Sequence, residues 1–129
     1  MVNRYLLDSD ILIWVLRRHP EFIALLRQLK ADGELAVSAA SVMEVQGGVR
    51  PGEELRVNTF LDGLVCLAVD RRIANKAGEY IRTYRARGIT LGVADSMIAA
   101  TAVLNDFTLV TLNVSHFPMP EIRLLRGTT

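Results

Sequence analysis

The sequence predicts an α/β protein whose parallel sheet is covered by helices. Short apolar runs alternate along the chain with longer segments whose apolar residues have helical spacing. The short runs are apolar on both faces, as in strands that helices cover on both sides. Half of the 129 residues are hydrophobic and no repeat, linker or low-complexity segment interrupts them. We therefore expect one domain, residues 1–129, built around one core.

The first elements are a strand and two helices. Residues 3–7 form a short apolar run and read as a buried strand. A helix begins over residues 11–16 and is interrupted at His19-Pro20, since proline cannot continue a helix. A second helix covers residues 20–33, with Pro20 suited to its first turn.

Two further helices flank a turn in the middle of the chain. Residues 34–38 form the second strand, which leads into a helix over residues 39–49 closed by its two glycines. Pro51-Gly52 then marks a turn. The next helix is expected over residues 53–63.

A third strand and a long amphipathic helix follow. Residues 64–69, "LVCLAV", read as a buried strand in which Cys66 is a small core residue. Asp70 caps the next helix, which runs to Arg87 and ends at Gly88.

The last third of the chain predicts the central helix of the fold. Residues 92–106, "GVADSMIAATAVLND", are apolar nearly all round, which indicates a buried helix. Residues 107–113 form the fourth strand, and residues 122–125 a fifth strand at the edge.

Composition and charge exclude several classes of protein. Charged residues break every apolar run well before the roughly 20 residues that a membrane span needs, and Asn3 and Arg4 argue against a signal peptide. We therefore expect a cytoplasmic protein. The lone cysteine excludes an internal disulfide and a thiolate metal site. The net charge is only +1, but 13 of the 15 basic residues are arginines, several in groups, a weak indication of phosphate binding.

Polar residues follow the predicted strands where those strands end. Asp8 and Asp10 follow the first strand, Glu44 lies early in the helix after the second, Asp95 opens the Ala-rich helix, and Asn113 follows the fourth strand. Open α/β sheets bind ligands beyond the carboxyl ends of their strands, so we expect these side chains to meet at one edge.

Each of these residues also has a purely structural explanation. Asp8 suits a turn and Asn113 an Asx turn. Glu44 could complete a capping box with Ser41, and Asp95 could be a helix N-cap. Acids among apolar neighbours are nevertheless an unusual choice for capping. As the number of such acids at strand ends grows, chance becomes a poorer explanation for their placement.

Carboxylates brought together from separate strands must either take up protons or hold a multivalent cation. A set of oxygen ligands without His or Cys selects Mg²⁺ or Mn²⁺ rather than zinc. Such an ion lowers the pKa of a water molecule and neutralises charge on a phosphoryl oxygen. This chemistry is phosphodiester hydrolysis, with water attacking phosphorus in line and no covalent enzyme intermediate.

The sequence resembles the PIN-domain nucleases, and among them the VapC-type toxins of bacterial toxin–antitoxin pairs. The resemblance rests on "LLDSDILIW", "VSAASVMEVQGG" and "GITLGVADSMIAATAVLNDFTLVTLNVSHF", and it covers almost the whole chain. It implies a PIN-like three-layer α/β/α sandwich with a mainly parallel sheet of four to five strands. It also implies a Mg²⁺- or Mn²⁺-dependent endoribonuclease that cuts structured RNA such as tRNA or rRNA, is inhibited by a cognate antitoxin and forms a homodimer.

The resemblance assigns roles to individual residues. Asp8, Glu44 and Asp95 match the three acids that hold metal in the family, and Asn113 matches the fourth site, which is often Asp in relatives. The loss of that charge implies weaker binding of a second metal. Asp10 either replaces part of this charge or bonds only to the following helix.

Two other residues have open roles. The imidazole of His116 either serves the site as an acid or base or belongs to a turn. Trp14 either packs with Phe22 in the core or lines a groove for an antitoxin segment, as the corresponding helices do in relatives.

Two alternative functions remain open at this level. A D-x-D after a strand also begins the haloacid-dehalogenase-like phosphatases, in which Asp8 would be the nucleophile. The chain is short for that fold and has only two lysines. The other alternative is a non-catalytic RNA- or protein-binding domain of the same fold, against which the presence of all three principal acids argues.

Overall fold

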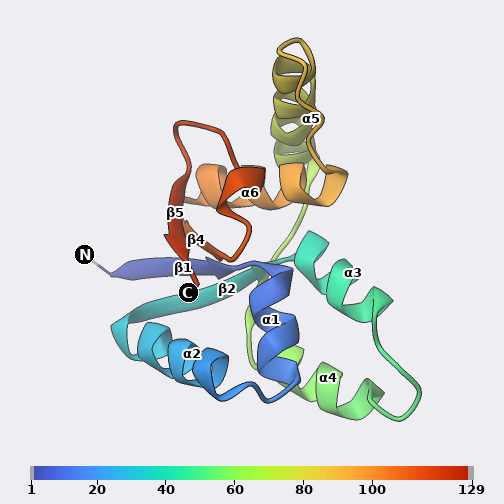
Figure 1. Ribbon diagram of the computed structural model, residues 1–129, viewed down its shortest axis with the longest axis vertical. Helices are drawn as coiled ribbons and strands as arrows, with labels where there is room; N and C mark the ends of the chain where they lie inside the picture. The colour runs from blue at the N-terminus through green and yellow to red at the C-terminus, as the bar shows by residue number, and fades with distance from the viewer. Residues whose placement is uncertain (1, 128–129) are drawn as a thin grey trace.

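The computed structural model describes residues 2–127 and has the predicted α/β architecture. A sheet of five strands in the order β3-β2-β1-β4-β5 lies between layers of helices, and all four pairings are parallel (Figure 1). The strands are β1 (Asn3–Leu7), β2 (Gly33–Ser38), β3 (Val65–Leu67), β4 (Thr108–Thr111) and β5 (Arg123–Arg126). The helices are α1 (Ser9–Leu16), α2 (Pro20–Asp32), α3 (Ala39–Gly47), α4 (Glu54–Asp62), α5 (Arg71–Arg85) and α6 (Val93–Asn105), with a 3-10 helix, η1 (Val114–His116).

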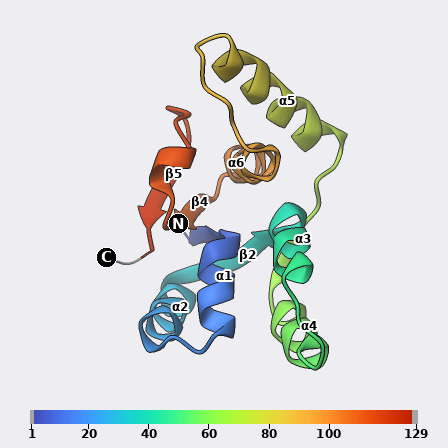
Figure 2. The same cartoon turned by 45° about the vertical axis from the view of Figure 1, so that its right-hand side comes forward.

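The helices divide between the two faces of the sheet. Helices α5 and α6 lie on one face and α1, α2 and α4 on the other, while α3 stands at the end of the sheet (Figure 1, Figure 2). Neighbouring residues in a strand point to opposite faces, so Leu6 faces the α5/α6 layer and Leu7 the α1/α2 layer. This arrangement confirms the parallel sheet covered by helices that the sequence pattern predicted and the three-layer sandwich that the resemblance implied. Because helices cover both faces, the strands lack polar alternation.

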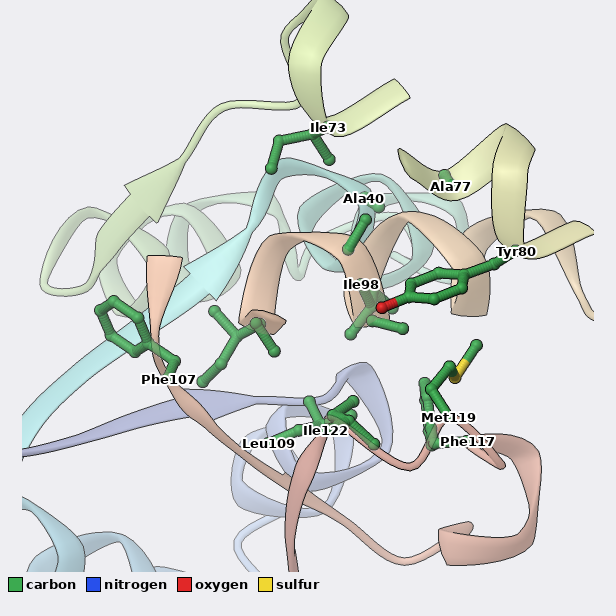
Figure 3. Packing of buried hydrophobic residues seen from close by; sticks show 14 of the residues in the cluster. Ala40, Ile73, Ala77, Tyr80, Ile98, Phe107, Leu109, Phe117, Met119 and Ile122 are labelled. Atoms are coloured by element: carbon green, nitrogen blue, oxygen red, sulfur yellow. The ribbon is translucent and has the colours of Figure 1, made fainter. Parts of the chain in front are cut away.

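Helix α6 is buried at the centre of the larger of two hydrophobic clusters, the one between the sheet and helix α5. Ile98 of α6 packs among Ile73 and Tyr80 of α5 and Leu109 of β4 (Figure 3). Four consecutive residues of α6, residues 99–102, are also fully or almost fully buried. The packing on all sides is the reason for the small, apolar composition of this helix, and it fixes the position of its first turn, which carries Asp95.

Local signals set the boundaries of the elements. Helix α1 begins at Ser9, two residues before the predicted start, because Asp8 caps it by accepting a hydrogen bond from the Ser9 amide. Asp70 caps α5 through the Ile73 amide, as predicted. Gly33 lies where a Cβ atom would stand 2.2 Å from the carbonyl oxygen of Asn3, so only glycine allows β2 to pair with β1 there.

The burial predicted for the third strand was wrong, and Trp14 makes its predicted contact with Phe22 without being buried. The third strand is three residues long and lies at the sheet edge, so Val65 is 61% exposed and Cys66 is exposed instead of buried. Trp14 is 36% exposed and stacks on Phe22 with ring centroids 5.7 Å apart, so the indole covers the core from outside rather than filling it.

Among the helices that the structure describes, none has both the length and the apolar character needed to cross a membrane.

Candidate functional site

Asp8 occupies the carboxyl end of the central strand β1. Its side chain is buried, with 4% of its surface exposed. One carboxylate oxygen accepts a hydrogen bond from the Ser9 amide at 2.8 Å, and the other accepts one from the Thr111 hydroxyl at 2.7 Å. Since Thr111 ends the adjacent strand β4, the two strand ends together hold this carboxylate in one orientation.

Asp10 and Asn113 meet at the same edge. Asp10 accepts a hydrogen bond from the Asn113 side-chain amide at 3.0 Å and another from the Leu112 backbone amide at 3.1 Å. Its second oxygen accepts one from the Ile11 amide at 2.7 Å. Asp10 therefore bonds to the helix that follows it and also reaches the segment after β4.

Glu44 is connected to Asp8 through Ser9. The Ser9 hydroxyl donates to the Glu44 carboxylate at 2.7 Å and lies 3.5 Å from the nearer oxygen of Asp8. The capping-box explanation for Glu44 is wrong, because Ser38 caps α3 by accepting from the Ala40 amide, and the Glu44 carboxylate bonds to Ser9.

Asp95 points from α6 to η1. It is the third residue of α6, and the N-cap position is Gly92, so the N-cap explanation for Asp95 is wrong as well. Its carboxylate lies 3.3 Å from Nδ1 of His116. The backbone amide of His116 does close a turn onto the Asn113 carbonyl, at 2.9 Å, while its imidazole contacts Asp95. His116 thus belongs both to the turn and to the site.

The four acids, Asp8, Asp10, Glu44 and Asp95, form what we call the acidic cluster. Burial raises the pKa of the Asp8 carboxyl to about 6, and the negative charges of Asp10 and Asp95 add to this effect. Burial also raises the pKa of Asp10, while the hydrogen bonds from the Leu112 and Ile11 amides oppose the rise. The cluster therefore holds carboxylates whose negative charge the surrounding protein does not fully offset.

Among residues 2–127, the basic side chain within ion-pair distance of the acidic cluster is that of His116, beside Asp95. In the part of the chain that the structure describes, the Lys and Arg residues that form ion pairs do so with acids outside the cluster. The donors are oxygen atoms, which suit a hard divalent cation better than zinc. Across residues 2–127 no group of three or more Asp, Glu, His or Cys side chains stands ready to hold a metal ion, so the acids are gathered at one edge without forming a closed cage. The uncompensated charge and the oxygen donors fit Mg²⁺ or Mn²⁺.

Sequence reasoning missed two residues of this site, Ser9 and Thr111. Ser9 links Asp8 to Glu44, and Thr111 both orients Asp8 and accepts a hydrogen bond from the Asn113 amide at 3.0 Å. The signal that could have identified these two residues was their position in the sequence. Ser9 stands between the two aspartates, and Thr111 ends the strand that Asn113 follows.

Comparison with known proteins points to one family. The model of the PIN domain matches residues 5–117. The chain is 40% identical over 116 residues to Ribonuclease VapC10 of Mycobacterium tuberculosis, covering 90% of this chain and 87% of that protein. It is 36% identical over 120 residues to Ribonuclease VapC19 of the same organism, covering 92% and 96%.

Solved structures agree with these sequence matches. The chain superposes with a TM-score of 0.82 and 27% identity on VapBC2 from Rickettsia felis, bound to a DNA fragment from their promoter. It superposes with a TM-score of 0.77 and 25% identity on a toxin–antitoxin complex from Klebsiella pneumoniae. Both alignments cover 95% of this chain and 97% of the other.

Proposed function

Since this chain belongs to the PIN-domain family and is similar to VapC ribonucleases, we propose that it is the ribonuclease toxin of a toxin–antitoxin pair. In this proposal it hydrolyses phosphodiester bonds in structured RNA such as tRNA or rRNA, and the reaction requires Mg²⁺ or Mn²⁺. The observation that carries the metal-dependent chemistry is the acidic cluster, whose charge no Lys or Arg in residues 2–127 pairs with. Because the chain belongs to the PIN-domain family, the alternative of a haloacid-dehalogenase-like phosphatase with Asp8 as nucleophile is not supported.

The residues of the site have distinct roles in this proposal. Asp8, Glu44 and Asp95 would hold the first cation, and Asn113 and Asp10 would support a second site. When bound, the cation lowers the pKa of a water molecule and neutralises charge that develops on the phosphoryl oxygens. Thr111 fixes the Asp8 carboxylate and Ser9 fixes that of Glu44, so both acids are oriented before substrate arrives. Burial of Asp8 excludes bulk water from that side of the site.

A protein inhibitor is part of the proposal. The solved relatives include a toxin–antitoxin complex from Klebsiella pneumoniae and VapBC2 of Rickettsia felis, which supports a cognate antitoxin as the partner of this chain. We also propose a homodimer, as the family resemblance implies.

The proposal is tested by incubating the purified chain with total bacterial RNA and mapping the new 5′ ends. We expect discrete cleavage sites in stable RNA with Mg²⁺ or Mn²⁺ and none with a chelator. The matched control is Asp62→Asn, which removes an exposed acid at the end of α4 and should leave the pattern unchanged. Cleavage that continues undiminished in chelator would refute the metal-dependent mechanism.

A second prediction concerns the space beside Asp95. A Cβ atom at Gly92 would stand 3.0 Å from the Asp95 carboxylate, closer than ordinary contact. The backbone of Gly92, with φ −64° and ψ 143°, accepts alanine without strain. We therefore expect Gly92→Ala to displace the Asp95 carboxylate by tenths of an ångström, to slow cleavage by about tenfold, and to change the free energy of unfolding by less than about 1 kcal/mol.

The measurement is the initial cleavage rate together with urea denaturation. Gly78→Ala, in α5 with open space around the added methyl, is the matched control and should cleave at the normal rate. Full activity in Gly92→Ala would show that the position of the Asp95 carboxylate does not limit the reaction.

A further inference from the structure

A pocket of about 320 Å³ adjoins the acidic cluster, and Asp95 is the residue of the cluster that lines it. One wall is the segment of residues 89–92 that connects α5 to α6, and the other is formed by residues from η1 to Pro118. Asp95 and His116 line the pocket and also belong to the candidate site, so the pocket opens directly beside the acids.

Tyr84 holds the two walls in place. Its hydroxyl donates to the Pro118 carbonyl of one wall at 3.3 Å, and its own carbonyl accepts a hydrogen bond from the Ile89 amide of the other at 2.9 Å. The Tyr84 side chain is itself buried in the core. Both walls of the pocket are therefore held by hydrogen bonds to the same buried residue, which fixes the shape of the pocket.

The lining of the pocket combines apolar surface with polar side chains. Ile89, which is 43% exposed, contributes apolar surface together with Leu91 and Pro118. Thr90 and Ser115 are exposed residues on opposite walls, and their hydroxyls can each donate and accept hydrogen bonds. A nucleobase has apolar faces that stack or pack and a polar edge that hydrogen-bonds, which is the same combination.

We propose that this pocket binds one unpaired nucleobase of the RNA, next to the phosphodiester bond that is cut. The proposal rests on the proposed ribonuclease function and adds the feature of the substrate that this chain would read. A base can enter a pocket with its edge free only when it is unpaired, so the site selects a single-stranded loop or end. Arg82 and Arg85, in the last turn of α5, and Arg87, in the segment between α5 and one wall, are exposed and supply positive charge for the adjoining phosphates.

The experiment separates base recognition from cleavage. A random single-stranded RNA library is captured on the protein in chelator, where cleavage is not required, and the retained RNAs are sequenced. We expect one base to be enriched at one position by about tenfold, the effect of one or two hydrogen bonds to its edge. The double variant Thr90→Val/Ser115→Ala should lose this enrichment while still retaining RNA.

The matched control is Thr59→Val, which changes an exposed threonine on α4, away from the pocket, and should keep the wild-type enrichment. Capture without any preferred base, or the same preference in the double variant, overturns the pocket as a base site. Because Thr90 and Ser115 are exposed, the double variant is expected to fold, and thermal melting checks this. Ile89→Ala supplies a second variant, which should weaken the enrichment by reducing contact with the face of the base.

Total bacterial RNA incubated with the protein and Mn²⁺, beside the library captured in chelator, distinguishes the two proposals. Base enrichment in chelator without cleavage in Mn²⁺ supports the pocket and refutes the ribonuclease mechanism. Cleavage at sites without any base preference supports the ribonuclease and refutes the pocket.

Discussion

Asp8→Asn should lower the rate of RNA cleavage by about a thousandfold or more. Asp8 is the most buried acid of the cluster, and its two oxygens are oriented by Thr111 and by the Ser9 amide. Asparagine has nearly the same shape and keeps one acceptor oxygen, so the substitution removes the charge while preserving the packing. The loss of activity would then be due to weaker cation binding and not to unfolding.

The measurement is the initial rate of cleavage of one mapped RNA at saturating Mn²⁺, with growth inhibition after induction as a cellular readout. Asp95→Asn is expected to show a similar loss, since its carboxylate, next to His116, is also proposed to hold the first cation. Glu34→Gln is the matched control because Glu34 is an exposed acid of β2 that pairs with Arg4 outside the site. Retained cleavage by both Asp8→Asn and Asp95→Asn would overturn the assignment of these acids.

The fold was predictable because its signals are local. Leu6 and Leu7 show the reason: adjacent apolar residues in a short strand must face opposite layers, so helices have to cover both sides. The glycines and prolines that end the helices act over one or two turns, and the boundaries follow them closely. The exposure of Cys66 was not predictable in this way, because edge and central strands differ in their neighbours and not in their own sequence.

The sequence predicted that the site residues gather where the strands end, but it did not predict the hydrogen bonds that connect them. The topology rule brings Asp8 and the segment after β4 to one edge, and the structure has Asp10 bonded to Asn113, 103 residues away. The Ser9 link to Glu44 and the His116 contact with Asp95 depend on side-chain orientation and on how α3 and η1 pack, which the sequence pattern does not specify. The structural explanations for Glu44 and Asp95 failed for the same reason, since other residues occupy the caps.

The metal-free protein should become more stable by about 3 kcal/mol at pH 7.5 when Asp8 is replaced by Asn. Burial raises the pKa of the Asp8 carboxyl from its ordinary value of 3.8 to about 6 in the folded state. The unfolded chain therefore loses this proton near pH 3.8, whereas the folded protein retains it until about pH 6. As the pH rises through this window the ionised carboxylate favours unfolding, and above it the full cost is present.

The stability gained by Asp8→Asn should accordingly be constant above about pH 6, shrink as the pH falls and vanish below 3.8. Urea denaturation of both proteins in chelator, at a series of pH values, measures the difference. Asp32→Asn is a control of opposite sign, because hydrogen bonds from Tyr5 and Asn3 lower the pKa of Asp32, so its charge favours folding at neutral pH. Added Mn²⁺ should stabilise the wild type and narrow the gap to Asp8→Asn, since an ion that binds only the folded state offsets the repulsion among the acids. An advantage of Asp8→Asn that grows toward acid pH would show that the buried carboxylate is not the source of the instability.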